Sequence, residues 1–349
     1  MKVAIVAPNW GNSWLPIYKG LLEEAGHKVF ILEPDGDKGT SYDAYIHMWA
    51  RRDNFIDFPG QHIMFMRRYE LFDPAQWVPL PWSGISDLIL CNDWIKKTVD
   101  NFFEKNKIKQ ATHLIYNAVD PSLWTFKERS HGKKIGMACH VHTKKNIPLA
   151  LQILDQLPYD YELHIAGDIQ DRCLAEYIYH VGSRIGRKIV LHGHIDREKL
   201  DSWWEDMSYC LSTSLSEGNP NNVLEAMAKG IKPVIHGWPG SESQFPVFYT
   251  AREAAAEIMS GSYLSSDYLK VVEEFHSLEN YKAVINLLKK EVIKVKEGSL
   301  LKKGLSSQET IKGDTKSYGM DNMSDAKNQK PMPTPKQSVD EKGKKFTIC

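Results

Sequence analysis

The sequence predicts an α/β protein made of two consecutive domains, each a parallel sheet covered by helices. Three observations predict this class. The chain has 349 residues, which favours two domains of ordinary size. Short apolar runs alternate with helical patterns along most of the chain, as in repeated βα units. The first run, Lys2–Ala7, is apolar almost throughout, as expected of a strand that is buried on both faces.

The first alternating series occupies residues 1–122. Apolar residues at helical spacing begin at Leu15 and stop at Gly26, and a second helix is expected over Asp93–Glu104. The strands expected here are Lys2–Ala7, Lys28–Glu33, Ala44–Met48, His62–Met66, Asp87–Asn92 and His113–Tyr116. This order of elements predicts a first Rossmann-like domain.

A second alternating series occupies residues 123–265 and follows a polar stretch that contains Pro121. The strands expected here are Lys134–Cys139, Glu162–Ala166, Ile189–His192, Tyr209–Ser212 and Pro233–His236. The helices expected here are Ile147–Gln156, Cys173–Gly182, Leu200–Met207 and Val223–Lys229. Parallel sheets of this kind bind ligands beyond the carboxyl ends of their strands, so two such domains that face each other predict a site in the cleft.

The end of the chain divides into two further parts. Residues 266–297 form a helical segment, with one long helical stretch expected over Asp267–Lys296. Residues 298–349 are rich in Pro, Ser, Thr and Asn, and from residue 300 onward they carry ten Lys against six Asp and Glu. This composition buries too little apolar surface to offset the entropy of ordering it, so we expect a disordered tail.

Composition narrows the class of protein. Lys and Arg number 44 and so do Asp and Glu, so no basic excess indicates a nucleic-acid partner. The five cysteines are widely spaced and include no C-x-x-C, which favours a reducing compartment over a disulfide framework or a zinc site. No run approaches the roughly 18–20 apolar residues that span a bilayer, and the first run is too short for a signal peptide. We therefore expect a cytoplasmic protein.

The most informative segment is Ser212–Gly230, where a strand leads into a polar loop and then a helix. Glu217 lies in the loop, and Glu225 follows eight positions later in the first turns of the helix. Backbone N–H groups at a helix start suit a phosphate, and carboxylates on either side would accept hydrogen bonds from sugar hydroxyls. The structural alternative is a capping box, with Asn222 as N-cap and Glu225 at N3, which would only stabilise the helix.

From residue 214 to residue 235 the chain follows the pattern S-x-x-E-G-x-P/G-x-x-x-L-E-A-M-A-x-G-x-P-V-I, with one additional residue between Gly230 and Pro233. It thereby resembles the retaining glycosyltransferases of family 4, and Glu217 and Glu225 fall on the E-x7-E pair of that family. Three more segments resemble family elements in the same order, namely Asn117–Asp120, Leu163–Asp168 and Ile189–His194. The resemblance implies the GT-B fold, in which two Rossmann-like domains face a central cleft.

The resemblance also implies roles for residues of the site. Glu217 would lie beside the donor sugar, and Glu225 would bind the ribose of the donor. The other positions that it assigns to the donor are Gly218, Asn219, Asn222, Val223, Leu224 and Gly240, with the helix start facing the diphosphate. Gly11 would belong to a loop near the acceptor and the donor phosphate, although a plain turn is the alternative there.

In the family, an Arg and a Lys that are five positions apart neutralise the diphosphate. Lys145 fits the Lys position, and we expect it to act in catalysis with Glu217. His140 stands at the Arg position, where a neutral imidazole supplies less charge, although an adjacent diphosphate would raise its pKa. A histidine buried at a strand end is the alternative for His140. No acceptor-side base is evident, and Glu70 is only a weak candidate.

The function that the resemblance implies is transfer of a sugar, with retained configuration, from a nucleoside-diphosphate sugar to a hydroxyl of a saccharide or lipid-linked acceptor. No cofactor and no metal are expected, since the histidine pairs His140/His142 and His192/His194 lack a third ligand. Surface polysaccharide or glycoconjugate assembly is the expected setting, and the basic tail suggests peripheral membrane contact. The alternatives are a non-catalytic sugar-nucleotide-binding protein of the same fold, or an epimerase or phosphorylase.

Overall fold

The computed structural model describes residues 1–8, 14–34, 36, 40–129, 131–261 and 263–288, all of which belong to one compact unit. These residues form two six-stranded sheets in which all strands are parallel. The predicted α/β class with two Rossmann-like sheets is therefore confirmed. The predicted tail, 298–349, lies outside the described residues, as do residues 289–297 of the helical segment.

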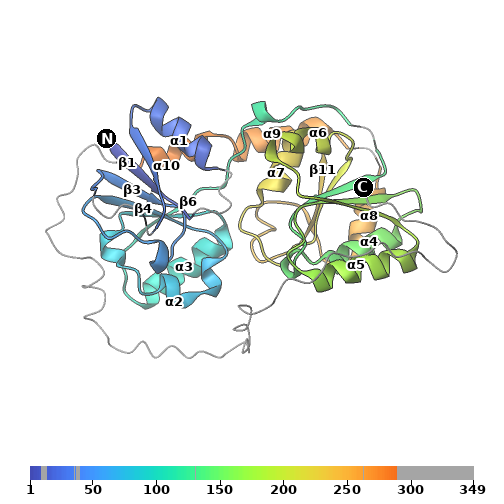
Figure 1. Cartoon of the computed structure of the whole chain (residues 1–349), viewed down its shortest axis with the longest axis horizontal. Coiled ribbons are helices and arrows are strands. Elements are labelled where there is room, and N and C mark those ends of the chain that lie inside the picture. Colours follow the sequence, from blue (N-terminus) through green and yellow to red (C-terminus); the bar gives the residue numbers. More distant parts are fainter. Residues whose placement is uncertain (9–13, 35, 37–39, 130, 262, 289–349) are drawn as a thin grey trace. The chain divides into compact units, whose positions relative to one another are not determined.

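The first sheet has the strand order β2-β1-β3-β4-β5-β6. Its strands are β1 (Lys2–Val6), β2 (Lys28–Leu32), β3 (Ala44–His47), β4 (Gln61–Met66), β5 (Asp87–Leu90) and β6 (Ala111–Leu114). One face is covered by α1 (Leu15–Glu24) and α10 (Glu279–Ile285), and the other by α2 (Pro74–Trp77) and α3 (Asp93–Lys105) (Figure 1). Every predicted strand exists, although β6 begins two residues before its predicted start, and α2 was not predicted because a single turn has no periodicity to detect.

The second sheet has the strand order β12-β11-β10-β7-β8-β9. Its strands are β7 (Lys134–Ala138), β8 (Glu162–Ala166), β9 (Lys188–Gly193), β10 (Tyr209–Ser212), β11 (Lys232–His236) and β12 (Val247–Phe248). Helices α4 (Ile147–Gln156), α5 (Arg172–Ile185) and α8 (Ala251–Met259) cover one face. Helices α6 (Arg197–Trp204), α7 (Asn221–Ala228) and α9 (Ser265–Phe275) cover the other (Figure 1).

Each sheet has one position where the strand order reverses, so that the chain leaves the two neighbouring strands toward opposite edges of the sheet. In the first sheet this position lies between β1 and β3, and in the second between β7 and β10. The loops that leave the carboxyl ends of such a strand pair run in opposite directions and leave a crevice, which is where ligands bind in open α/β sheets. The loops after β7 and β10 are the ones that carry Lys145 and Glu217.

The expected single helical stretch over 267–296 is instead two helices, α9 and α10, within the described residues. The chain leaves helical geometry at His276, whose Nδ1 donates to the carbonyl oxygen of Asn117 at 3.1 Å. It then places α10 on the first sheet, where the ring of Tyr281 lies 4.3 Å from the ring of Tyr18. The apolar pattern continues across the break because both helices bury one face, but against different sheets.

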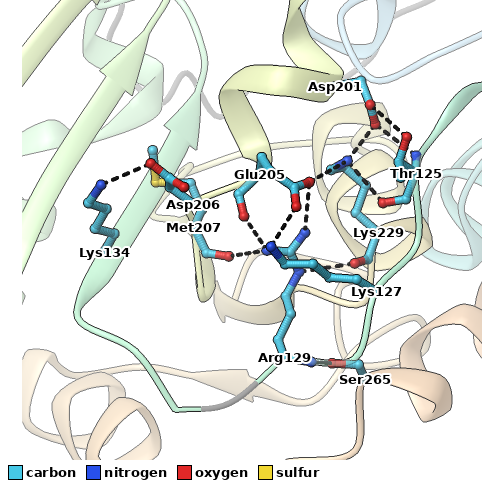
Figure 2. Close-up of polar contacts among 10 residues, drawn as sticks. All are labelled: Thr125, Lys127, Arg129, Lys134, Asp201, Glu205, Asp206, Met207, Lys229 and Ser265. Atoms are coloured by element: carbon cyan, nitrogen blue, oxygen red, sulfur yellow. Dashed lines mark hydrogen bonds and ion pairs between the residues drawn. The ribbon is translucent and has the colours of Figure 1, made fainter.

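A cluster of charged side chains anchors the segment that crosses from the first sheet to the second (Figure 2). Lys229, at the end of α7, is fully buried, and its ammonium pairs with Asp201 and donates to the carbonyl oxygen of Thr125. Asp201 also accepts hydrogen bonds from the N–H and the hydroxyl of Thr125. Arg129 donates to the carbonyl oxygens of Lys229 and Glu205. These contacts fix the crossover segment to α6 and to the end of α7.

Candidate functional site

Two loops meet at the crevice of the second sheet. The loop after β7 carries Lys144 and Lys145 in a short helical turn, and the loop after β10 carries Glu217. The ammonium of Lys145 lies 2.6 Å from Oε1 of Glu217, and that of Lys144 lies 3.6 Å from Oε2. The sequence-predicted pair, Lys145 and Glu217, is therefore brought together by the fold.

Backbone contacts hold these loops in register. The hydroxyl of Thr213 donates to the carbonyl oxygen of Lys145 at 2.8 Å, and the N–H of Leu215 donates to that of Lys144 at 2.9 Å. Asn146 adopts φ 49°, a left-handed conformation that Asn tolerates better than most residues, and it ends the turn before α4 begins. The position of Lys145 is thus determined by strand β10 as well as by its own loop.

Burial and charge oppose each other at this pair. Burial acts to raise the pKa of Glu217, but Lys145 and Lys144 outweigh it, so the pKa of Glu217 lies below its ordinary value. Burial likewise acts to lower the pKa of Lys145, but the neighbouring Glu217 carboxylate raises it above its ordinary value. The pKa of Lys144 is lowered, mainly by burial. Glu217 is therefore an ionised carboxylate at neutral pH and an unsuitable proton donor.

Helix α7 begins at Asn221, and no side chain caps its start, where Pro220 is the N-cap residue. The capping box considered for Asn222 and Glu225 is therefore wrong. Glu225 is nearly buried and accepts a hydrogen bond from Nη1 of Arg197 at 2.8 Å. Burial raises the pKa of Glu225, and the guanidinium of Arg197 opposes that rise. Glu225 is thus held toward α6 by an arginine that the sequence analysis did not single out.

His140 follows β7 at the position where the resemblance expects an arginine. Its ring is half exposed, and the N–H of Asp168 donates to its Nδ1 at 3.2 Å. The same Nδ1 lies 3.5 Å from Oδ2 of Asp168, so Nδ1 faces Asp168. The backbone at Gly167 lies close to the backbone at Cys139 and His140. Only glycine fits there, because a Cβ would lie 2.2 Å from the carbonyl oxygen of Cys139. His140 is therefore an accessible ring, and not a buried core histidine.

One cavity of about 510 Å³ joins these groups. The predicted residues that line it are Lys145, Glu217, Glu225, His140, Gly218, Asn219 and Asn222. Lys144, Asn221, Arg197 and His194 also line it from the second sheet, and Arg67, Arg68 and Asn117 line it from the first. Its size and its few convergent charged groups are typical of a small-molecule site.

The first sheet contributes residues that the sequence analysis did not assign to the site. Arg67 and Arg68 follow β4 directly, and Nη1 of Arg67 donates to Oδ1 of Asn117 at 2.9 Å. Their position just beyond the carboxyl end of a parallel strand was a signal that could have identified them. Glu70, the weak candidate for an acceptor-side base, is fully buried, accepts hydrogen bonds from the N–H groups of Arg67 and Ala50, and does not line the cavity.

The loop after β10 is tied to the first sheet. Nδ2 of Asn117 donates to the carbonyl oxygen of Asn219 at 2.7 Å, and Nδ2 of Asn92 donates to that of Gly218 at 3.0 Å. Gly240 does not line the cavity, and its carbonyl oxygen accepts from Asn92 at 3.2 Å. A Cβ at Gly240, which has φ 89°, would lie 2.2 Å from Oδ1 of Asn92, so glycine is required for this contact.

Two further predicted positions lie in the hydrophobic core. The side chains of Val223 and Leu224 are fully buried in α7, and their N–H groups both point to the carbonyl oxygen of Pro220, at 3.1 and 3.3 Å. A ligand at this helix start would therefore meet the N–H groups of Asn221 and Asn222, which precede the intrahelical ladder. Gly11 lies outside the described residues.

The described residues include neither a cluster suited to a metal ion nor a helix suited to a membrane. No group of three or more His, Cys, Asp or Glu side chains is arranged to hold a metal ion there. Among the same residues, every helix is too short or too polar to cross a bilayer.

Comparison with known protein families finds one match, which covers about a third of the chain. Residues 132–247 match the family model described as glycosyl transferases group 1. No curated protein sequence matches the chain significantly. The matched span contains Lys145, Glu217, Glu225 and His140.

Solved structures extend the likeness over both sheets. A sucrose-phosphate synthase from Thermosynechococcus elongatus has a TM-score of 0.68 at 12% identity, covering 82% of this chain and 98% of its own. A glycosyltransferase from Rickettsia africae has a TM-score of 0.64 at 11% identity, and the match covers 83% of this chain and 98% of the glycosyltransferase. HepE of Anabaena, in complex with UDP and glucose, has a TM-score of 0.63 at 14% identity, with 82% and 98% covered. The fold is thus the GT-B fold, and the family match supports a glycosyltransferase.

Proposed function

We propose that this protein is a retaining, metal-independent glycosyltransferase of the family 4 type. It would move a sugar from a nucleoside-diphosphate sugar to an acceptor hydroxyl. The observation that carries the proposal is the convergence of Lys145, Glu217, Glu225 and the uncapped start of α7 on one cavity, at the strand-order reversal of the second sheet.

The charges of the cavity suit a diphosphate. Lys144 and Lys145 supply two ammonium groups, and the first N–H groups of α7 add partial positive charge. His140 would contribute a ring N–H donor to a phosphate oxygen rather than the full charge of an arginine. The structure of HepE with UDP and glucose, on the same fold, supports a sugar nucleotide as the ligand class.

The two glutamates would orient the donor. Glu225, nearly buried at the far side of the α7 start, would accept hydrogen bonds from the ribose hydroxyls. Arg197 holds Glu225 now, so the ribose would share that carboxylate with the guanidinium or replace one of its contacts. Glu217, held ionised by the two lysines, would accept hydrogen bonds from hydroxyls of the donor sugar.

The chemical step needs stabilisation of the negative charge that grows on the diphosphate as the glycosidic bond breaks. Preorganised ammonium and N–H donors supply it without reorganisation, which is the role that a metal ion has in other enzymes. In the proposed retaining reaction the acceptor hydroxyl attacks the face that the diphosphate leaves, and a diphosphate oxygen takes the proton. No side-chain nucleophile and no cofactor is then required.

The biological setting belongs to the same proposal. The acceptor would be a saccharide or a lipid-linked saccharide, as in surface polysaccharide or glycoconjugate assembly. The protein would act in the cytoplasm, and at the inner face of the membrane if its acceptor is lipid-linked.

A second candidate, a non-catalytic protein that binds sugar nucleotides, is favoured by one observation, the presence of His140 instead of arginine. Transfer and donor hydrolysis, measured for wild type, Glu217→Ala and Lys145→Ala, separate the two. Loss of turnover in both variants supports the enzyme, whereas binding without turnover in wild type supports the second candidate. Interconversion of free donor would instead indicate an epimerase, and release of sugar 1-phosphate with inorganic phosphate a phosphorylase.

The donor is identified by thermal shift with UDP-, GDP- and ADP-sugars, because a ligand that binds only the folded state raises its melting temperature. Glu225→Gln should abolish most of the shift produced by the matching nucleotide, since a ribose contact is lost. Glu274→Gln, a change on the surface of α9, is the matched control. A wild-type protein that none of these nucleotides stabilises would contradict the proposal.

A further inference from the structure

Two adjacent arginines at the carboxyl end of β4 form a cationic corner of the cavity, defined by Arg67 and Arg68. The two residues are only 7% and 6% exposed, and both line the cavity. Among the described residues the hydrogen-bond partners of the two guanidinium groups are neutral, namely Oδ1 of Asn117 for Arg67 and the hydroxyl of Ser216 for Arg68. The one anionic contact of Arg67 among these residues is made by its backbone N–H, which donates to the buried carboxylate of Glu70. Nε of Arg67 and Nη1 of Arg68 are buried, and neither has a hydrogen-bond partner in the part of the chain that the structure describes.

Aromatic rings support this corner without neutralising it. The guanidinium of Arg67 lies 4.1 Å from the ring of Trp14, and that of Arg68 lies 4.2 Å from the ring of Trp94. Such stacking fixes the planes of the guanidinium groups, but a ring carries no net charge. Glu217 lies near Arg68, but Lys145 and Lys144 already pair with it. Buried charges are normally paired, and neither guanidinium forms an ion pair with a carboxylate of the described residues, so this corner of the cavity suits an anionic group of a ligand.

Other groups of the cavity are assigned to the diphosphate of the proposed donor. Lys144, Lys145 and the start of α7 face that group from the second sheet, whereas Arg67 and Arg68 belong to the first. Next to them Tyr69, which is 64% exposed, also lines the cavity and offers an aromatic face to a sugar ring. The planar fork of arginine matches carboxylate and phosphate groups, which accept two parallel hydrogen bonds.

We infer that the acceptor is a saccharide that carries an anionic group, phosphate or carboxylate, and that Arg67 and Arg68 bind this group. The inference rests on the proposed function, because it assigns the remaining ligand of the same cavity. Arg68 would bind the anion directly, and the tie of Arg67 to Asn117 would keep the pair in place.

The test is titration calorimetry of the full chain with three sugars of one stereochemical series, such as glucose, glucose 6-phosphate and glucuronate, repeated for the galactose and mannose series. A charged sugar of at least one series should bind about 10- to 100-fold more tightly than its neutral parent. Arg68→Gln should remove that preference, and Arg68→Lys, which keeps the charge without the fork, should retain part of it. Arg184→Gln, an exposed arginine of α5, should leave it unchanged. The phosphate and carboxylate arms identify which anion is bound.

Three results would overturn the inference. One is the absence of any preference for charged sugars, and another is an equal loss in Arg68→Gln and Arg184→Gln. The third is a loss of nucleotide binding in Arg68→Gln with unchanged sugar-phosphate binding, which would assign Arg68 to the donor. Titration of wild type with UDP, GDP and ADP tests the proposed function separately, since its failure would appear there. Arg68→Lys keeps the test valid if Arg68→Gln does not fold.

Discussion

The side-chain amide of Asn92 donates to the carbonyl oxygen of Gly218 at 3.0 Å and so joins the end of β5 to the loop after β10 in the second sheet. Oδ1 of the same side chain accepts hydrogen bonds from the N–H groups of Trp94 and Ile95 and thereby caps α3. One buried amide thus serves a helix start in the first sheet and a loop conformation in the second.

This double role allows the two functions to be separated by one substitution. Asn92→Asp keeps the oxygen that caps α3 but replaces the donor to Gly218 and Gly240 with an oxygen that faces their carbonyls. Loss of these bonds and the new repulsion should lower stability by about 1–3 kcal/mol. Thermal unfolding, with UDP-sugar titration as a second readout, checks this. Asn92→Ser, which also keeps a capping oxygen but adds no charge, is the control, and an unchanged Asn92→Asp would contradict the joining role.

Lys145 should be essential for turnover. Its ammonium is held beside Glu217 and faces the proposed diphosphate, so Lys145→Ala removes charge stabilisation in the transition state. We expect kcat to fall by about 10²–10³-fold with a smaller change in KM, as for loss of one preorganised donor. Lys270→Ala, on the exposed surface of α9, should behave as wild type. A Lys145→Ala enzyme with normal kcat would remove Lys145 from the mechanism.

The two glutamates should make opposite contributions to the pH dependence of stability. The pKa of Glu217 is lowered in the folded state, so the unfolded state binds more protons and stability rises with pH through the window below the ordinary value, about 4.3. The pKa of Glu225 is raised, so the folded state binds more protons and stability falls as pH rises above that value.

Glu217→Gln removes the rise in stability with pH, and Glu225→Gln removes the fall in stability with pH. The destabilisation of Glu217→Gln relative to wild type should therefore be larger at pH 7 than at pH 3, whereas Glu225→Gln should gain stability relative to wild type between pH 3 and pH 7. Melting temperatures of the three proteins at both pH values measure this. Equal shifts of the same sign for the two variants would contradict the opposed environments.

Lys229 should be a determinant of stability rather than of catalysis. Its ammonium is fully buried against Asp201, and Lys229→Met leaves that carboxylate without its partner (Figure 2). Because the carboxylate is partly exposed and gains water in compensation, we expect a loss of about 2–4 kcal/mol in the free energy of unfolding. Lys127→Met, which removes a half-exposed partner of Glu205, should cost under about 1 kcal/mol. Urea unfolding checks both, and equal effects would argue against the buried pair.

The fold could be predicted from the sequence because most strands are continuous apolar runs. Ile147–Gln156, Glu162–Ala166 and Tyr209–Ser212 have the predicted boundaries, since turn residues delimit them on both sides. The two-residue strand β12 and the helix α8 after it escaped prediction. The helix break at His276 was not predicted either. Only the contact of His276 with Asn117, which is distant in sequence, distinguishes this residue from a helical one.

The second-sheet half of the candidate site could be predicted because its residues lie in one contiguous pattern. Glu217 and Glu225 are eight positions apart, and Lys145 follows a strand that was recognised. Arg67, Arg68 and Arg197 escaped because each reaches the cavity from another element, and no local spacing connects them to it. The alternative capping box at Asn222 is wrong because the helix begins two residues earlier than that box requires, which moves Glu225 away from the N3 position.

The return of the chain at α10 limits how the protein can be divided. A fragment that ends near residue 122 would contain all six strands of the first sheet but would leave Tyr18 and its apolar neighbours open to water, since Tyr281 and Val284 cover them. The amino-terminal half therefore needs a segment encoded more than 150 residues later. Expression of residues 1–122 alone would leave the part of this face that α10 covers exposed to water and prone to self-association, unless residues 279–288 are supplied in trans or fused to it.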